Sequence, residues 1–129
     1  MSTENRQDRL REHPTERFAS AEREIDLDAC FDDLLDEPHE AIDGHRQITI
    51  FHQASLTLTL FYFQEGGHLP EHVVDGPVTI QVLDGDLEVS TSEADHRLSA
   101  GQLLVLAPGV EHDVKAHAES RMLLTVRVA

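Results

Sequence analysis

Two histidines carry the clearest chemistry in this chain. His72 lies in "GGHLPEHVVDGPVTIQVLDG", residues 66–85, and His112 lies in "GVEHDV", residues 109–114. Neutral imidazoles bind divalent transition metals, and they also exchange hydrogen bonds with polar groups of small molecules. A third histidine, His68, lies four positions before His72, and this even spacing gives both residues the same strand parity. These residue types predict a metal site or a small-molecule pocket, provided that the fold brings them together.

Valines follow His72 where a strand would point them to the same face. Alternation places the side chains of Val74 and Val78 beside His72 on the interior side of that strand. Apolar neighbours exclude water from the entrance of a pocket, and they make a histidine harder to protonate. We therefore expect Val74 and Val78 to line a pocket for an apolar or weakly polar molecule, although simple core filling is the alternative.

The elements that must position these side chains are short strands. From about residue 46 the apolar pattern has a period of two, and Gly, Pro and small polar residues separate its segments. Asp84-Gly85 is a tight-turn signal between two of them. We count about nine strands with no helices between them, which predicts an all-β sandwich or barrel.

One helix is expected before the strands. The segment "IDLDACFDDLLDEP" places apolar residues at helical spacing, with Asp26 available as the N-cap and Pro38 ending the run. Residues 1 to about 24 are charged and weakly patterned, which is typical of a mobile arm. We therefore divide the chain into residues 1–45, an acidic arm with a short amphipathic helix, and residues 46–129, a β-barrel domain.

Charge limits the classes of partner. The 129 residues contain 25 Asp and Glu against 10 Lys and Arg, a formal charge of −15. Such a surface repels phosphate backbones and anionic lipids, so neither nucleic acid nor a membrane is expected as a partner. The polar N-terminal segment does not resemble a secretory signal, and the single Cys30 has no intrachain disulfide partner. We therefore expect a cytoplasmic protein.

Two glycine-framed motifs give the chain a resemblance to the cupin family. The first runs from Gly66 through five residues to His72, then Val74 and Val78, and closes at Gly85. The second runs from Gly101 through five residues to Ala107-Pro108-Gly109, and then to His112 and Ala116. Residues 86–100 separate the two motifs, a length of 15 residues that is similar to that of small bacterial cupins.

The resemblance implies a jelly-roll, or double-stranded β-helix, that forms a homodimer. It also implies an interior metal site of three histidines and one glutamate. This chain keeps His72 and His112 in that pattern, while Val74 and Val78 replace a histidine and the glutamate. The sequence therefore does not decide whether the chain binds a metal cofactor. A divalent transition metal (Zn, Fe, Ni or Mn) would need His72, His112 and a further ligand, for which His68 is the first candidate and His52 another.

Three functions remain open from the sequence. The first is a small cupin that binds a small molecule, with or without a degenerate metal site. The second is a metal-dependent enzyme of the dioxygenase or isomerase type, which requires at least three protein ligands. The third is a sensor or interaction module that docks a partner on its acidic helix. No catalytic residue is assigned, and five other histidines are expected at the surface: His13, His39, His45, His96 and His117.

Overall fold

The computed structural model describes residues 21–128, which form one helix and nine strands. The helix is α2 (Leu27–Leu35), and the strands are β1 (His45–Gln53), β2 (Leu56–Phe63), β3 (His68–His72), β4 (Val78–Asp84), β5 (Asp86–Ser90), β6 (Asp95–Ser99), β7 (Leu103–Leu106), β8 (His112–Ala116) and β9 (Ser120–Arg127). Within these residues the all-β prediction is confirmed, and so are the expected short helix before the strands and the count of nine strands. No helix within this range is long and apolar enough to cross a membrane.

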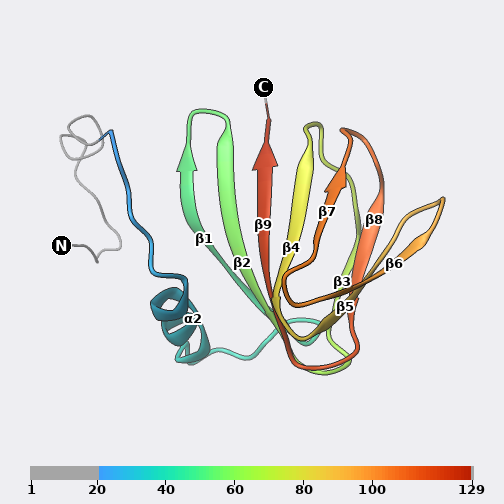
Figure 1. Cartoon of the computed structure of the whole chain (residues 1–129). Helices are drawn as coiled ribbons and strands as arrows, with labels where there is room; N and C mark the ends of the chain where they lie inside the picture. Colours follow the sequence, from blue (N-terminus) through green and yellow to red (C-terminus); the bar gives the residue numbers. More distant parts are fainter. Residues whose placement is uncertain (1–20, 129) are drawn as a thin grey trace.

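The strands form two antiparallel sheets that face each other. The five-stranded sheet has the order β1-β2-β9-β4-β7, and the four-stranded sheet has the order β3-β8-β5-β6. Figure 1 shows the five-stranded sheet running from β1 across to β7, with the strands of the second sheet behind and beside it. This arrangement brings β3 and β8, which are far apart in the sequence, into one antiparallel pair.

Apolar residues of both sheets fill the space between them. Alternation in β4 and β5 buries every second side chain, so that each strand gives one face to the core. The largest contributions come from fully buried side chains: Phe63, Ile80, Val82, Leu87, Val89 and Met122. Strands β3 and β8, which carry His72 and His112, pack against this core through Leu69 and Val114.

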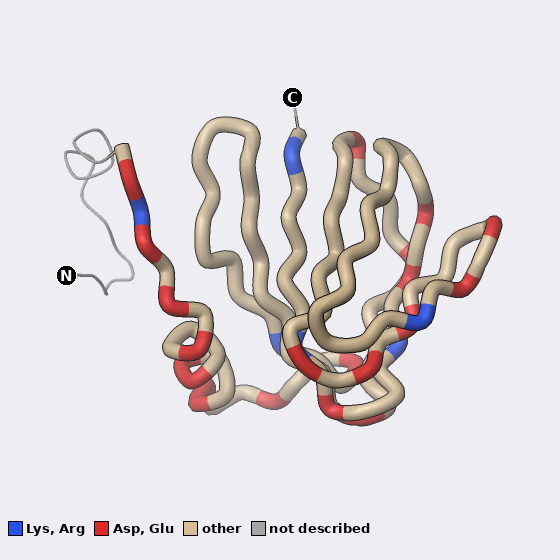
Figure 2. The backbone as a smooth tube through the Cα atoms, viewed as in Figure 1, with Lys and Arg blue, Asp and Glu red and all other residues tan. Residues whose placement is uncertain are grey.

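Helix α2 covers the outer face of the five-stranded sheet. Asp26 caps the helix, because its carboxylate accepts a hydrogen bond from the backbone N–H of Ala29 at 3.2 Å. Phe31 and Leu34 are buried against Leu60 of β2, so the helix buries an apolar stripe that the sheet would otherwise expose. The acidic residues of α2 are exposed, and Figure 2 shows their positions along the helix in red. Residues 1–20, where the sequence predicts a mobile arm, lie outside the described range, and the domain boundary at residue 46 stays a prediction.

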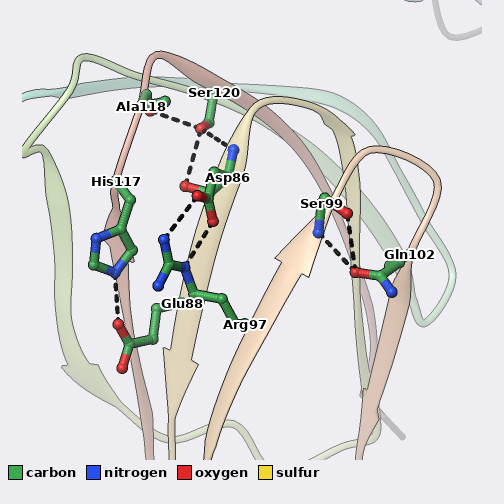
Figure 3. Close-up of polar contacts among 8 residues, drawn as sticks. All are labelled: Asp86, Glu88, Arg97, Ser99, Gln102, His117, Ala118 and Ser120. Atoms are coloured by element: carbon green, nitrogen blue, oxygen red, sulfur yellow. Dashed lines mark hydrogen bonds and ion pairs between the residues drawn. The ribbon is translucent and has the colours of Figure 1, made fainter.

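The outer face of the four-stranded sheet is polar instead. Arg97 of β6 donates two hydrogen bonds of 2.8 Å to the carboxylate of Asp86 on β5. His117 lies 2.6 Å from the carboxylate of Glu88, and the Ser120 hydroxyl accepts from the Asp86 N–H at 3.0 Å (Figure 3). Because these acidic and basic side chains bond to one another and are at least partly exposed to solvent, this face needs no covering helix. The two sheets therefore differ in what they show to the outside, while both turn apolar faces inward.

Candidate functional site

His72 and His112 come together at the end of the β3–β8 pair. They are directly opposite each other in the strand register, and their ring centroids lie 4.1 Å apart with an angle of 60° between the planes. The sequence separates them by 40 positions, so the pairing of β3 with β8 alone creates this contact. The prediction that the two imidazoles meet is thus reproduced in the structure.

Backbone carbonyls fix which nitrogen of each ring carries the proton. The Nδ1 atom of His72 lies 3.0 Å from the carbonyl oxygen of Pro70, and Nδ1 of His112 lies 3.0 Å from that of Val110. A carbonyl oxygen only accepts hydrogen bonds, so each Nδ1 must donate. In the neutral state, each Nε2 therefore keeps its lone pair and is an acceptor.

The acceptor of His112 is buried and unsatisfied. The residue is 2% exposed, and its Nε2 has no hydrogen-bond partner among residues 21–128. Burial lowers the pKa of His112, the nearby His72 lowers it further, and the Val110 carbonyl partly offsets both effects. A buried acceptor without a partner costs about 1–3 kcal/mol. The fold therefore maintains a neutral imidazole whose lone pair is available to a donor from outside the chain.

His68 does not join this pair, because β3 contains a bulge. The register of β3 on β8 shifts between Leu69 and His72. Leu69 lies opposite the buried Val114, whereas His68 lies opposite the exposed Lys115 and is itself exposed. The two residues between Leu69 and His72 add one position to the strand, which reverses the alternation. The expectation that His68 shares a face with His72 is therefore wrong.

A second bulge affects His52 in the same way. The register of β1 on β2 shifts between Thr49 and Phe51, so His52 no longer shares a face with Ile48. The ring of His52 is exposed and lies 2.7 Å from the hydroxyl of Thr57. This histidine is therefore occupied at the end of a hairpin and does not approach the pair.

The donor set does not match that of a metal site with three or four protein ligands. Within residues 21–128 there is no group of three or more His, Cys, Asp or Glu residues placed to hold a metal ion. Val78 is buried in the core and Val74 packs against it, at the positions where the motif carries metal ligands. The two imidazoles lack the further protein ligands that catalytic zinc sites, for example, provide. The residues present therefore do not fit the family's metal.

A cavity of about 600 Å³ is lined by sequence neighbours of the pair, although neither His72 nor His112 lines it. Val73 and Glu111, the neighbours of His72 and His112 in the sequence, both line it, as does Val110. Its other lining residues come from the β5–β6 turn, from β6 and from β7 with the loop after it: Thr91, Ser92, Glu93, Ala94, His96, Leu104, Val105, Leu106, Ala107 and Gly109. Neither Val74 nor Val78 lines this cavity, because Val78 is part of the closed core.

His96 is the functional candidate that sequence reasoning missed. We expected it at the surface, but it is half-buried and lines the cavity. It lies opposite the buried Val89. The alternation of "DHRLS", in which His96 has the parity of the partly buried Leu98, is the signal that could have found it.

The other histidines have structural partners. His45 was expected at the surface and is instead only 8% exposed, with its Nδ1 3.0 Å from the carbonyl of His68 and its ring beside Phe61 and Phe63. His117 is half-buried beside Glu88, and His39 is exposed beside Glu37. His13 lies outside the described residues.

Comparison with solved structures gives many matches of the same fold. A conserved protein of unknown function from Streptococcus pyogenes has 25% identity and a TM-score of 0.63, over 67% of this chain and 76% of that one. A cupin superfamily protein from Desulfitobacterium hafniense has 16% identity and a TM-score of 0.65, over 70% and 84% of the two chains. An RmlC-like cupin from Desulfovibrio desulfuricans has 23% identity and a TM-score of 0.63, over 74% and 92%.

The sequence itself also matches a known family. No curated protein matches the chain. The profile of the Cupin domain family, in contrast, matches residues 59–127, which contain both glycine-framed motifs and the His72–His112 pair. The fold predicted from the resemblance, a jelly-roll preceded by a short helix, is therefore confirmed, and the chain belongs to the cupin family.

Proposed function

We propose that this cupin binds a small molecule at the His72–His112 pair. The observation that carries the proposal is the buried Nε2 of His112, which has no partner among residues 21–128. A fold gains nothing in stability from an unsatisfied acceptor, since satisfying or removing it would recover about 1–3 kcal/mol. A bound ligand that donates a hydrogen bond to this nitrogen would offset that cost.

The surroundings of the pair support the same function. His72 is half-buried, so solvent reaches one member of the pair, while His112 is buried. A cavity of about 600 Å³, a volume in the range of small-molecule sites, is lined by Val73 and Glu111, the sequence neighbours of the two histidines, and by apolar side chains such as Leu104, Leu106 and Val110.

The two alternatives have less support. A metal-dependent enzyme of the dioxygenase or isomerase type would need a third protein ligand, which no residue in the described range supplies. A sensor that docks a partner on α2 would have to use the acidic side of the helix, because Phe31 and Leu34 are already buried against the sheet. A homodimer and a cytoplasmic location stay predictions from the resemblance and the sequence.

The test is a fragment screen monitored at the histidines. Long-range ¹H–¹⁵N spectra resolve the imidazole signals, and a set of uncharged and charged aromatic fragments is titrated into the untagged protein. We expect some fragments to shift the signals of His72 and His112, and we expect this binding to be lost in the double variant His72→Ala/His112→Ala. The variant His68→Ala, on the opposite face of β3, is the control and should bind as the parent does.

Two results would overturn the proposal. The first is a double variant that keeps its fold and binds every fragment that the parent binds. The second is a complete screen in which no fragment shifts either imidazole. Elemental analysis of the same preparation addresses the enzyme alternative, because a stoichiometric transition metal would show that the donor set is larger than the described residues provide.

A further inference from the structure

The cavity of about 600 Å³ lies at the side of the molecule where the two sheets do not join. Strand β7 is the edge of the five-stranded sheet and β6 is the edge of the four-stranded sheet, and no ladder of the described chain pairs them. Both strands lie toward the right of the view in Figure 1. Residues of both line the cavity, whereas His72 and His112 do not. Binding in this cavity is therefore a separate property from binding at the pair.

Part of the cavity wall is apolar and exposed to water. Val105 of β7 is 62% exposed, and Val73, which follows β3, is 52% exposed. Both line the cavity, together with the half-buried Leu104 and Val110. Apolar side chains in a concave site lose their contact with water when a ligand covers them, which favours binding. This wall therefore fits the apolar part of a small organic molecule.

The cavity also carries two carboxylates that no cation neutralises. Its lining includes Glu93, in the β5–β6 turn, and Glu111, just before β8, and it includes no Lys or Arg. Both glutamates are exposed, and neither forms an ion pair with a described residue. Arg97 follows the cavity residue His96 in β6, but its guanidinium is bound to Asp86 on the other face of the strand. The charge of the cavity is therefore negative.

An organic cation fits this arrangement better than a metal ion or an anion does. Within residues 21–128, no three His, Cys, Asp or Glu side chains are placed to hold one metal ion, although His96 lines the cavity with the two glutamates. An ammonium group needs only one carboxylate, and a neutral imidazole can accept a further hydrogen bond from it. The formal charge of −15 repels anions and concentrates cations near the surface.

We propose that the cavity between β6 and β7 binds organic cations in which an ammonium group is joined to an apolar body, such as arylalkylamines. The ammonium group pairs with Glu93 or Glu111, and the apolar body covers Val73 and Val105. An uncharged analogue keeps the apolar contact and loses the ion pair, while a small ammonium ion keeps the ion pair and loses the apolar contact. The preference for a molecule that has both parts is the signature of this site.

Four probes at pH 7.5 and low salt separate the two contributions. Benzylammonium carries the charge and the ring, benzyl alcohol lacks the charge, methylammonium lacks the ring, and benzoate reverses the charge. Dissociation constants come from the methyl shifts of Leu104, Val105 and Val110, which report on the cavity itself. We expect benzylammonium to bind about three- to fivefold more tightly than benzyl alcohol, because an ion pair at a partly exposed site contributes about that factor. Methylammonium and benzoate should bind more weakly than either.

Charge-neutralising variants test whether the glutamates cause the preference. In Glu93→Gln/Glu111→Gln the ratio of the two affinities, benzylammonium to benzyl alcohol, should fall to about one, and the single variants show which carboxylate pairs with the ammonium group. Glu40→Gln/Glu65→Gln is the matched control. Both of its residues are exposed and neither lines the cavity, so the net charge changes equally while the ratio should stay as in the parent.

Several results would overturn the proposal. An unchanged ratio in Glu93→Gln/Glu111→Gln would do so, and so would an equal fall in the control, because it would show attraction by net charge alone. Methylammonium binding as tightly as benzylammonium, or no shift of the cavity methyls by any probe, would have the same consequence. His72→Ala/His112→Ala should bind benzylammonium as the parent does, and a loss there would show that the cavity is not a separate site. Failure of the cavity to bind amines leaves binding at the pair in place.

Discussion

Replacing His112 by leucine tests the central claim that the fold tolerates an unsatisfied group for the sake of a ligand. His112 is 2% exposed, and its Nε2 is without a partner in the described residues. Most substitutions at so buried a position destabilise a protein, typically by 2–5 kcal/mol for loss of a large side chain. Here we expect the opposite sign in the ligand-free protein.

The magnitude follows from the contacts of the ring. Removing the orphaned acceptor recovers about 1–3 kcal/mol. Losing the hydrogen bond from Nδ1 to the Val110 carbonyl, 3.0 Å long, costs about 0.5–1.5 kcal/mol. Leucine replaces the buried area of the imidazole, so the net change should be a gain of about 1 kcal/mol in the free energy of unfolding.

Urea denaturation of both proteins without added ligand measures this change. The midpoint should rise while the slope of the transition stays constant, which identifies a change of stability and not of the denatured state. Leu87→Ala is the matched control in the same core; Leu87 is 0% exposed, and its truncation should cost about 2–5 kcal/mol. A loss of more than about 2 kcal/mol in His112→Leu would refute the reasoning, since it would show that the imidazole is fully satisfied.

Three further predictions concern the pKa of His112, the two valines of the first motif and the glycine at the end of that motif. Burial lowers the pKa of His112 in the folded state. The contribution of His112 to stability should therefore be greatest above pH 6.5 and should fall as the pH drops toward the lowered pKa. Urea midpoints measured from pH 8 to pH 5 should change less with pH in His112→Leu than in the parent. Val74→His/Val78→Glu restores the ligand types of the motif and should bind one divalent metal per chain by elemental analysis, whereas the parent should not. Gly85→Ala should lower the free energy of unfolding, measured by urea denaturation, by at least about 2 kcal/mol, because φ is +99° and a Cβ there would collide with the start of β9. Gly101→Ala is the control; its φ is +88°, but no neighbour lies in reach of a Cβ, so the loss should be smaller.

The fold was largely predictable because its signals are local. Alternation in β4 and β5, the Asp84-Gly85 turn and the Asp26 cap each depend on a few consecutive residues, and all three are confirmed. The glycines of the two motifs added the jelly-roll fold through the resemblance.

The site was predictable only where strand parity is uninterrupted. His72 and His112 meet as expected, but His68 does not share a face with His72, and His52 does not share a face with Ile48, because a bulge interrupts each strand between the two residues. A bulge depends on how two strands pair, and the sequence of one strand does not contain that information. His96 was missed for the opposite reason: its alternation was regular, but its polar neighbours suggested a surface strand.

Val110 contributes to the site through two separate parts. Its carbonyl oxygen holds Nδ1 of His112, and the residue also lines the cavity. The side chain of Val110 therefore contributes to the shape of the cavity. The orientation of the His112 imidazole depends instead on the backbone carbonyl, which any amino acid at position 110 would provide. A substitution at Val110 can therefore change the volume of the cavity and still keep the backbone acceptor that orients the His112 ring.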